Sequence, residues 1–206
     1  MQYKKLFVIL SSIFLLAGCT SPIENVGSNA VTGIPIFTFE KHISDHMPAF
    51  KFEVYEGEWD GHDFPQIIYT IEISCPEFDF APQSIKVSSF DKWDENRHGR
   101  NHYIDLVDIT FDGYSDIQAL MHMATANTTY LYYRWNVSKR AFEEEYFFSM
   151  ITKGYELYPE LKQITNYVNG NSSSYSREVY QLEEIKNGHS EEYKKISDEN
   201  LLKNAG

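Results

Sequence analysis

The chain has 206 residues, 30 acidic residues against 18 lysines and arginines, and a formal net charge of −12. Such a surface repels nucleic acid and anionic lipid headgroups, and it favours encounter with a cationic protein. Aromatic residues make up 16% of the chain, so beyond a short N-terminal segment it has the apolar material for a folded core.

The first residues, MQYKKLFVILSSIFLLAGC, are typical of an export signal. Lys4 and Lys5 precede an apolar run that is too short for a permanent membrane span of about 20 residues. The sequence LAGC, which ends at Cys19, resembles the lipobox of bacterial lipoproteins. The resemblance implies a signal peptide over residues 1–18 and lipidation of Cys19. An ordinary secretory signal with an incidental cysteine is the alternative.

Several consequences follow if Cys19 becomes the lipidated N-terminus. Thr20 stands where an Asp would imply retention in the inner membrane, so the resemblance implies an anchor on the periplasmic face of the outer membrane. Removal of two lysines and no acid changes the net charge from −12 to −14. Cys75 is then the only other cysteine, and its apolar surroundings predict a small buried side chain without a disulfide.

The predicted elements after a polar tether at residues 19–33 are mostly strands. Polar and apolar residues alternate in KFEVYEG (51–57), IIYTIEIS (67–74) and SIKVSSF (84–90), which predicts a β-meander over residues 34–103. In residues 104–206, hairpins are predicted from TYLYYRW (129–135) with AFEEEYFFSMI (141–151), and from KQITNYV (162–168) with SREVYQLEEI (176–185). Asn187-Gly188 predicts a further hairpin turn.

Helix is scarce in this pattern. The most helix-like segment is 116–124, and it is also compatible with a strand. The sequence therefore predicts an all-β fold of antiparallel hairpins, arranged as a small propeller-like or meandering array.

The stretch DITFDGYSD, residues 108–116, has the spacing of a cation-binding loop. Alternate positions supply the candidate ligands, and a sharp turn is expected at Gly113. Calcium prefers six to eight oxygen ligands, which such a loop can supply from one segment. Ala119 stands where an EF-hand would have its bidentate Glu, which excludes that motif. We predict a calcium site formed by Asp108, Thr110, Asp112, the Tyr114 carbonyl and Asp116; a solvated polar turn is the alternative.

A zinc site and a glycosidase site have little support in the sequence. The pairs His42/His46 and His98/His102 have zinc-like spacing, but Pro, Gly and Asn around them argue against helices, so exposed loop histidines are favoured. Glu143 and Glu145 are expected to share a solvated strand face instead of acting as a glycosidase pair. We expect no enzyme activity.

The segment VNGNSSSYSRE, residues 168–178, is predicted to be a long hairpin loop between two strands. Its serines and backbone N–H groups are adaptable hydrogen-bond donors, and Tyr175 and Arg177 are side chains that commonly anchor interfaces. A loop of this kind can enter a narrow cleft. A disordered polar hairpin tip is the alternative.

Taken in order, the lipobox, the acidic β-rich body, FDGYSD, YLYYRWN and NYVNGNSSSYSREVYQLEE resemble the periplasmic lipoproteins that protect bacteria from lysozyme-like effectors. These include the immunity proteins of antibacterial type IV secretion systems. The resemblance covers residues 104–184 and implies a propeller-like domain with a calcium loop. It also implies an inhibitory Gly-Gly-Ser-Tyr-Arg-Glu-type loop, whose counterparts here are Gly170, Ser174, Tyr175, Arg177 and Glu178. Asn171 replaces the second glycine, and Ser176 separates Tyr175 from Arg177.

The family resemblance implies that this loop plugs the cleft of a lysozyme-like muramidase or secreted effector. A lysozyme has one protonated and one ionised carboxyl group in its cleft, so a hydroxyl group and Arg177 are suitable partners. A carbohydrate- or protein-binding surface lipoprotein that uses Tyr132, Trp135 and Tyr146 is the alternative.

Overall fold

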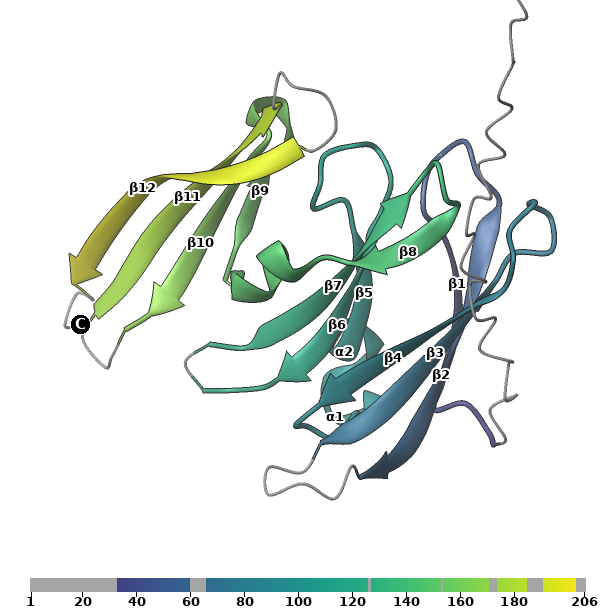
Figure 1. Ribbon diagram of the computed structural model, residues 1–206. Helices are drawn as coiled ribbons and strands as arrows, with labels where there is room; N and C mark the ends of the chain where they lie inside the picture. The colour runs from purple at the N-terminus through teal and green to yellow at the C-terminus, as the bar shows by residue number, and fades with distance from the viewer. Residues whose placement is uncertain are drawn as a thin grey trace, which may run out of the picture. The chain divides into compact units, whose positions relative to one another are not determined.

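The computed structural model describes residues 33–59, 66–125, 127–152, 154–170, 174–184 and 191–202. In these ranges the protein consists of three four-stranded antiparallel sheets, with only short helical turns between them (Figure 1). The prediction of an all-β fold built from antiparallel hairpins is confirmed.

The first sheet has the strand order β1-β2-β3-β4. Its strands are β1 (Phe37–His42), β2 (Ala49–Trp59), β3 (Ile67–Ser74) and β4 (Gln83–Ser89). Buried and half-buried residues alternate along the whole of β3, as expected for a strand with one face on the core. The predicted β-meander is confirmed, and β1 adds a strand that the sequence pattern did not reveal.

The second sheet has the order β5-β6-β7-β8. Its strands are β5 (Ile104–Val107), β6 (Asp116–His122), β7 (Thr129–Asn136) and β8 (Ala141–Glu144). The helical interpretation of residues 116–124 is wrong, because β6 is a strand whose first five residues are all buried. The strand expected over residues 141–151 ends at Glu144. A 3-10 helix, η1 (Tyr146–Met150), follows it, and the Glu145 side chain caps this helix by accepting the Phe147 N–H.

The third sheet has the order β12-β11-β10-β9. Its strands are β9 (Glu156–Tyr158), β10 (Gln163–Asn169), β11 (Ser174–Glu184) and β12 (Glu191–Leu202), and a 3-10 turn, η2 (Pro159–Leu161), joins β9 to β10. The hairpin predicted from residues 162–168 and 176–185 is confirmed as the β10–β11 pair. β11 and β12 also pair in antiparallel fashion, but the predicted Asn187-Gly188 turn lies outside the described residues.

Two single-turn helices connect the first sheet to the second. They are α1 (Glu95–His98), capped by the Asp94 side chain, and α2 (Arg100–Tyr103), and Gly99 separates them with a left-handed φ of 75°. The expectation that the segment around His98 and His102 is not helical was therefore wrong, although neither helix exceeds one turn. In the described part of the chain, no helix has the length and apolar character needed to cross a membrane.

One hydrophobic core contains side chains from all three sheets. The rings of Phe50 and Trp135 meet edge to face with centroids 5.5 Å apart, which joins the first two sheets. The rings of Phe147 and Tyr180 meet at the same centroid separation, which joins η1 to the third sheet. Residues 31–206 form one compact unit, so the core continues across the expected boundary at residues 103 and 104. Cys75 is buried and has no disulfide, as predicted.

Candidate functional site

The acidic loop of residues 108–115 connects β5 to β6, and Asp116 is the first residue of β6. Gly113 has a left-handed φ of 85°, a conformation that favours glycine because a side chain there would be strained. Phe111 also has a positive φ, of 56°, which is uncommon for a bulky residue. The loop therefore has a constrained backbone that presents Asp108 and Asp112 from one short segment.

The Asp116 carboxylate lies inside the protein and has no solvent exposure. Its Oδ2 accepts hydrogen bonds from the Ile109 N–H at 3.2 Å and from the Thr110 hydroxyl at 3.1 Å. Its Oδ1 accepts the Trp135 N–H at 2.9 Å. Burial raises the pKa of Asp116 to about 7, although the hydrogen bonds from Trp135 and Thr110 oppose the increase. Asp116 thus links the acidic loop to β7.

Asp108 and Asp112 organise the exposed part of the acidic loop. The two Asp108 oxygens accept the N–H groups of Asp112 at 3.2 Å and Gly113 at 3.0 Å. Asp112 Oδ1 accepts the Tyr114 N–H at 3.0 Å, and Asp112 Oδ2 lies 3.5 Å from Arg134 Nη2. Burial raises the pKa of Asp108, the Gly113 N–H opposes this, and the nearby Asp112 carboxylate raises the pKa further.

The predicted calcium ligands fit a cation only in part. Among the described residues, no group of three or more His, Cys, Asp or Glu side chains is placed to hold a metal ion. Thr110 and Asp116 are both buried and are bonded to each other, whereas Asp108 and Asp112 bond the backbone of their own loop. The loop brings the predicted residues into one segment but does not direct their oxygens to one point, so calcium binding remains a prediction.

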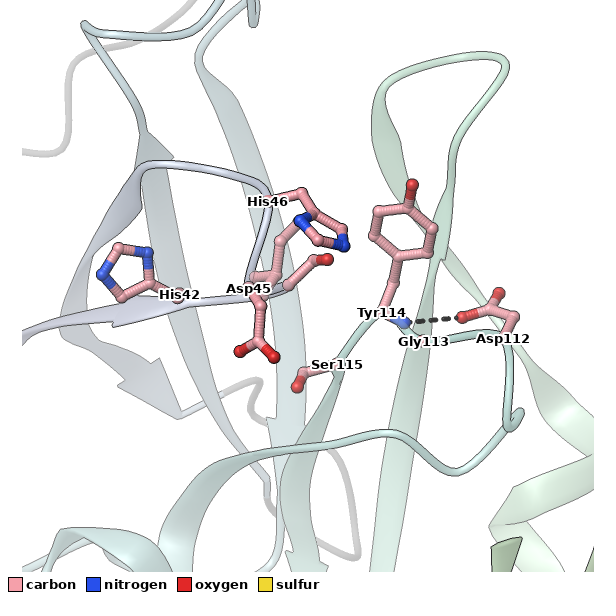
Figure 2. Close-up of a pocket in the computed structure, with 9 residues that line it drawn as sticks. His42, Asp45, His46, Asp112, Gly113, Tyr114 and Ser115 are labelled. Carbon is pink, nitrogen blue, oxygen red and sulfur yellow. Dashed lines mark hydrogen bonds between the residues drawn. The ribbon is translucent and has the colours of Figure 1, made fainter. Parts of the chain in front are cut away.

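A polar depression of about 510 Å³ adjoins the acidic loop. Figure 2 shows residues 42–46, at and just after the end of β1, on one side and residues 112–115 on the other, with the His46 and Tyr114 rings directed towards each other. The Ser115 N–H donates to the Ile43 carbonyl at 2.6 Å, which holds the two segments together. His42 bonds the Met47 carbonyl through Nδ1 at 2.7 Å. The depression could not be predicted from the sequence, because its two sides are about 70 residues apart and neither contains a motif that indicates contact with the other.

A second depression, of about 440 Å³, shares Asp112 with the first and is lined by residues 134–138 and 143–145. Glu143 accepts hydrogen bonds from Lys139 and from Asn136 Nδ2, and these bonds lower its pKa, the Lys139 bond most. Glu145 does not share the β8 surface with Glu143 as expected, since it caps η1. Acidic side chains therefore lie around both depressions.

The long loop predicted over residues 168–178 is largely strand. β10 continues to Asn169 and β11 begins at Ser174, with Asn169 paired to Tyr175 and Val168 to Ser176. The Gly170 N–H donates to the Ser174 carbonyl at 3.2 Å and closes the hairpin. Residues 171–173 lie outside the described residues. The serine-rich composition masked the strand, because cross-strand pairing overrides the weak β-propensity of serine.

The candidate inhibitory residues divide between the two faces of β11. Tyr175 and Arg177 are two residues apart and share one face, and Ser174 lies beside the turn. Glu178 belongs to the other face, where its carboxylate accepts hydrogen bonds from Asn166 at 3.2 Å, Tyr180 at 2.9 Å and Lys195 at 2.6 Å. Glu178 is thus part of the internal structure of the sheet, whereas the side chains of Tyr175 and Arg177 are partly exposed.

Two other sequence expectations have structural outcomes. Tyr132 and Trp135, proposed for an exposed aromatic surface, are buried, whereas Tyr146 is 70% exposed. The rings of His98 and His102 stack with centroids 4.8 Å apart. The predicted lipidation site, Cys19, lies outside the described residues.

No family model and no curated protein sequence matches the chain. Among solved structures, the structure of a Xanthomonas type IV secretion system related protein aligns with 80% of this chain and 92% of that chain. The TM-score is 0.49 and the sequence identity is 11%. No conclusion about function follows from a similarity of this size.

Proposed function

We propose that the protein is a lipid-anchored periplasmic inhibitor of a lysozyme-like peptidoglycan hydrolase, and that it acts by binding and not by catalysis. The β10–β11 hairpin is the observation on which the proposal rests, because it presents Ser174, Tyr175 and Arg177 beside the Gly170–Ser174 hydrogen bond at its end. The sequence resemblance to immunity lipoproteins supports the same segment.

The turn end of this hairpin is attached to the connection between β6 and β7. Asn127 Nδ2 donates to the Asn169 carbonyl at 3.0 Å, and the Asn169 N–H donates to Asn127 Oδ1 at 2.8 Å. This reciprocal pair holds Asn169, the last residue of β10, next to the turn at Gly170. Strand ends held in this way lose less conformational entropy on binding than those of a free loop would.

The hairpin chemistry suits the cleft of a muramidase. The hydroxyl groups of Ser174 and Tyr175 can donate to or accept from a carboxyl group, and Arg177 can pair with an ionised carboxylate. The net charge of the mature chain, −14 after loss of Lys4 and Lys5 from −12, would speed association with a basic hydrolase through long-range attraction. Glu178 is assigned a supporting role in place of cleft contact, because its carboxylate is bonded within the sheet.

Calcium and the lipid anchor belong to the proposal as accessory features. Calcium, if held by Asp108 and Asp112, would offset the repulsion between these neighbouring carboxylates and fix the acidic loop. Lipidation at Cys19 would place the domain where a hydrolase enters the periplasm.

The test is inhibition of peptidoglycan lysis by the chain without residues 1–19, which lie outside the compact unit of residues 31–206. A panel of chicken-type, goose-type and effector-derived muramidases is assayed with wild type and with the double variant Tyr175→Ala, Arg177→Ala. We expect inhibition of at least one enzyme and its loss in the double variant, with the melting curve unchanged. If no enzyme is inhibited, or if the double variant inhibits as well as wild type, the proposal fails.

A further inference from the structure

One face of the third sheet carries a line of tyrosines. Directly opposed residues of antiparallel strands point to the same face, as do residues two apart along a strand. Tyr158 lies opposite Gln163, and Arg177 lies opposite Tyr167. Because Gln163 and Tyr167 are an even number of residues apart on β10, all four side chains share one face. We name this surface the tyrosine face; it comprises Glu156, Tyr158, Gln163, Tyr167, Tyr175 and Arg177.

The other face of the same sheet packs against the core. Ile164, Tyr180 and Leu182 are buried there. By contrast, Tyr158 is 40% exposed and Glu156 is exposed. Thr165 and Val179 also belong to this side of the sheet and are only 1% and 7% exposed, so it is the larger side chains around them that can meet a ligand.

The tyrosine face is extended along the strands. Tyr158 pairs with Gln163, and Tyr175 pairs with Asn169. Asn169 lies six residues beyond Gln163 on β10. At about 3.3 Å per residue this separation is about 20 Å. At the Tyr175 end, the rings of Tyr167 and Tyr175 have centroids 6.0 Å apart. A linear ligand fits such a line better than a compact one.

The Glu156 carboxylate orients two of the rings. Its Oε2 accepts the Tyr158 hydroxyl at 2.6 Å and lies 3.5 Å from the Tyr167 hydroxyl. These contacts engage the polar ends of both tyrosines, so the ring faces are the parts available for stacking. Because Glu156 is exposed, its carboxylate can also accept a hydrogen bond from a ligand hydroxyl group.

The charges on this face balance. Glu156 and Arg177 on the tyrosine face carry opposite charges, and among the described side chains that continue the same side of the sheet Lys194 pairs with Glu183 at 3.6 Å. This balance contrasts with the net charge of −12 for the whole chain. A neutral ligand fits this face, whereas a cationic segment would be drawn to the acidic depressions around Asp112.

We propose that the tyrosine face is a binding site for a linear, neutral oligosaccharide of β-1,4-linked pyranose units. The C–H face of a pyranose ring stacks on an aromatic ring, and its equatorial hydroxyl groups pair with planar polar side chains. Tyr158, Tyr167 and Tyr175 supply the rings, and Glu156, Gln163 and Arg177 supply the planar groups. A β-1,4-linked chain is flat and extended, as the sheet face requires. This inference does not depend on hydrolase inhibition.

The experiment titrates the chain without residues 1–19 with chitopentaose, cellopentaose and, as a curved α-linked control, maltopentaose, by NMR and calorimetry. We expect at least one β-linked sugar to bind and maltopentaose to bind much more weakly. Tyr158→Ala and Tyr167→Ala should each weaken binding about five- to tenfold. Tyr146→Ala, at an exposed tyrosine on η1, is the matched control and should leave binding unchanged.

Several results would overturn the proposal. They are no sugar binding by wild type, equal binding of the α-linked control, or full binding by both tyrosine variants. Tyr158→Phe keeps the ring and removes the hydroxyl, so retained binding there with loss in Tyr158→Ala attributes the effect to stacking. Melting curves of all variants exclude unfolding. Muramidase inhibition measured on the Tyr158 variants separates the two functions, because Tyr158 lies on β9 at the far end of the face from Tyr175, whereas Tyr167 is opposite Arg177 and contacts Tyr175.

Discussion

The buried Asp116 carboxylate accepts the backbone N–H of Trp135 at 2.9 Å, so an acid from the cation-like motif is a structural link between β6 and β7. Asp116→Ala would leave three donors without this acceptor, namely the Ile109 N–H, the Thr110 hydroxyl and the Trp135 N–H. We expect this variant to lose about 2–4 kcal/mol of unfolding free energy. Urea unfolding at constant calcium measures the loss. Asp45→Ala, at an exposed acid beside the same loop, is the control and should change stability by less than about 0.5 kcal/mol.

Calcium binding by the acidic loop can be tested separately from this structural role. If Asp108 and Asp112 hold calcium, a free concentration about a hundredfold above the dissociation constant should stabilise the fold by about 2.7 kcal/mol. A chelator should then lower the melting temperature of wild type. Asp108→Asn should melt at the same temperature with and without calcium. An unchanged wild-type melt together with calcium-free elemental analysis would leave the polar-turn interpretation.

Alternation of polar and apolar residues predicted β2, β3 and β4, and the predicted hairpins of the second half correspond to β7, β10 and β11. The pattern failed where both faces of a strand are buried, as in β6, and where pairing overrides composition, as at Ser174. The sequence also located the acidic residues of the loop, but it could not show that Asp116 points into the core. Neither the depression beside His46 nor the tyrosine face has a local motif, because the first depends on two loops joined by the Ser115–Ile43 hydrogen bond and the second on strand pairing.

Glu178 makes the stability of the third sheet sensitive to acid. Burial opposes its ionisation, but hydrogen bonds from Lys195, Tyr180 and Asn166 outweigh burial and lower its pKa below 4.5. The ionised carboxylate therefore stabilises the fold above the unfolded-state pKa, and this contribution disappears as the pH falls through the lower folded-state pKa. Glu178→Gln should be less stable than wild type at pH 7 by about 1–2 kcal/mol and should approach it near pH 3. Chemical denaturation across this pH range measures the difference. Glu183→Gln, at a more exposed glutamate of the same strand, is the control.

Membrane attachment depends on Cys19. Cys19→Ser removes the sulfur that would carry the lipid, so we expect the precursor to remain unprocessed or the protein to leave the outer-membrane fraction. Cell fractionation and labelling with a fatty-acid analogue measure this change. Cys75→Ser is the control, because Cys75 is buried within the fold and should have no effect on fractionation. Processing and fractionation of Cys19→Ser like wild type would contradict the anchor.

The acidic side chains around the depression beside Asp112 and the β10–β11 hairpin should affect hydrolase inhibition in different ways. Tyr175→Ala or Arg177→Ala should each weaken inhibition about thirtyfold or more, mainly through faster dissociation, if these side chains are desolvated in the cleft. Glu143→Gln changes a partly exposed charge beside Asp112, so it should slow association at low salt and have little effect at high salt. Surface plasmon resonance at low and high ionic strength separates the two rates. The assignment would be reversed if Glu143→Gln accelerated dissociation while the hairpin variants changed only the salt-dependent association rate. The hairpin would then be the rim of the interface, and the depression beside Asp112 would be its centre.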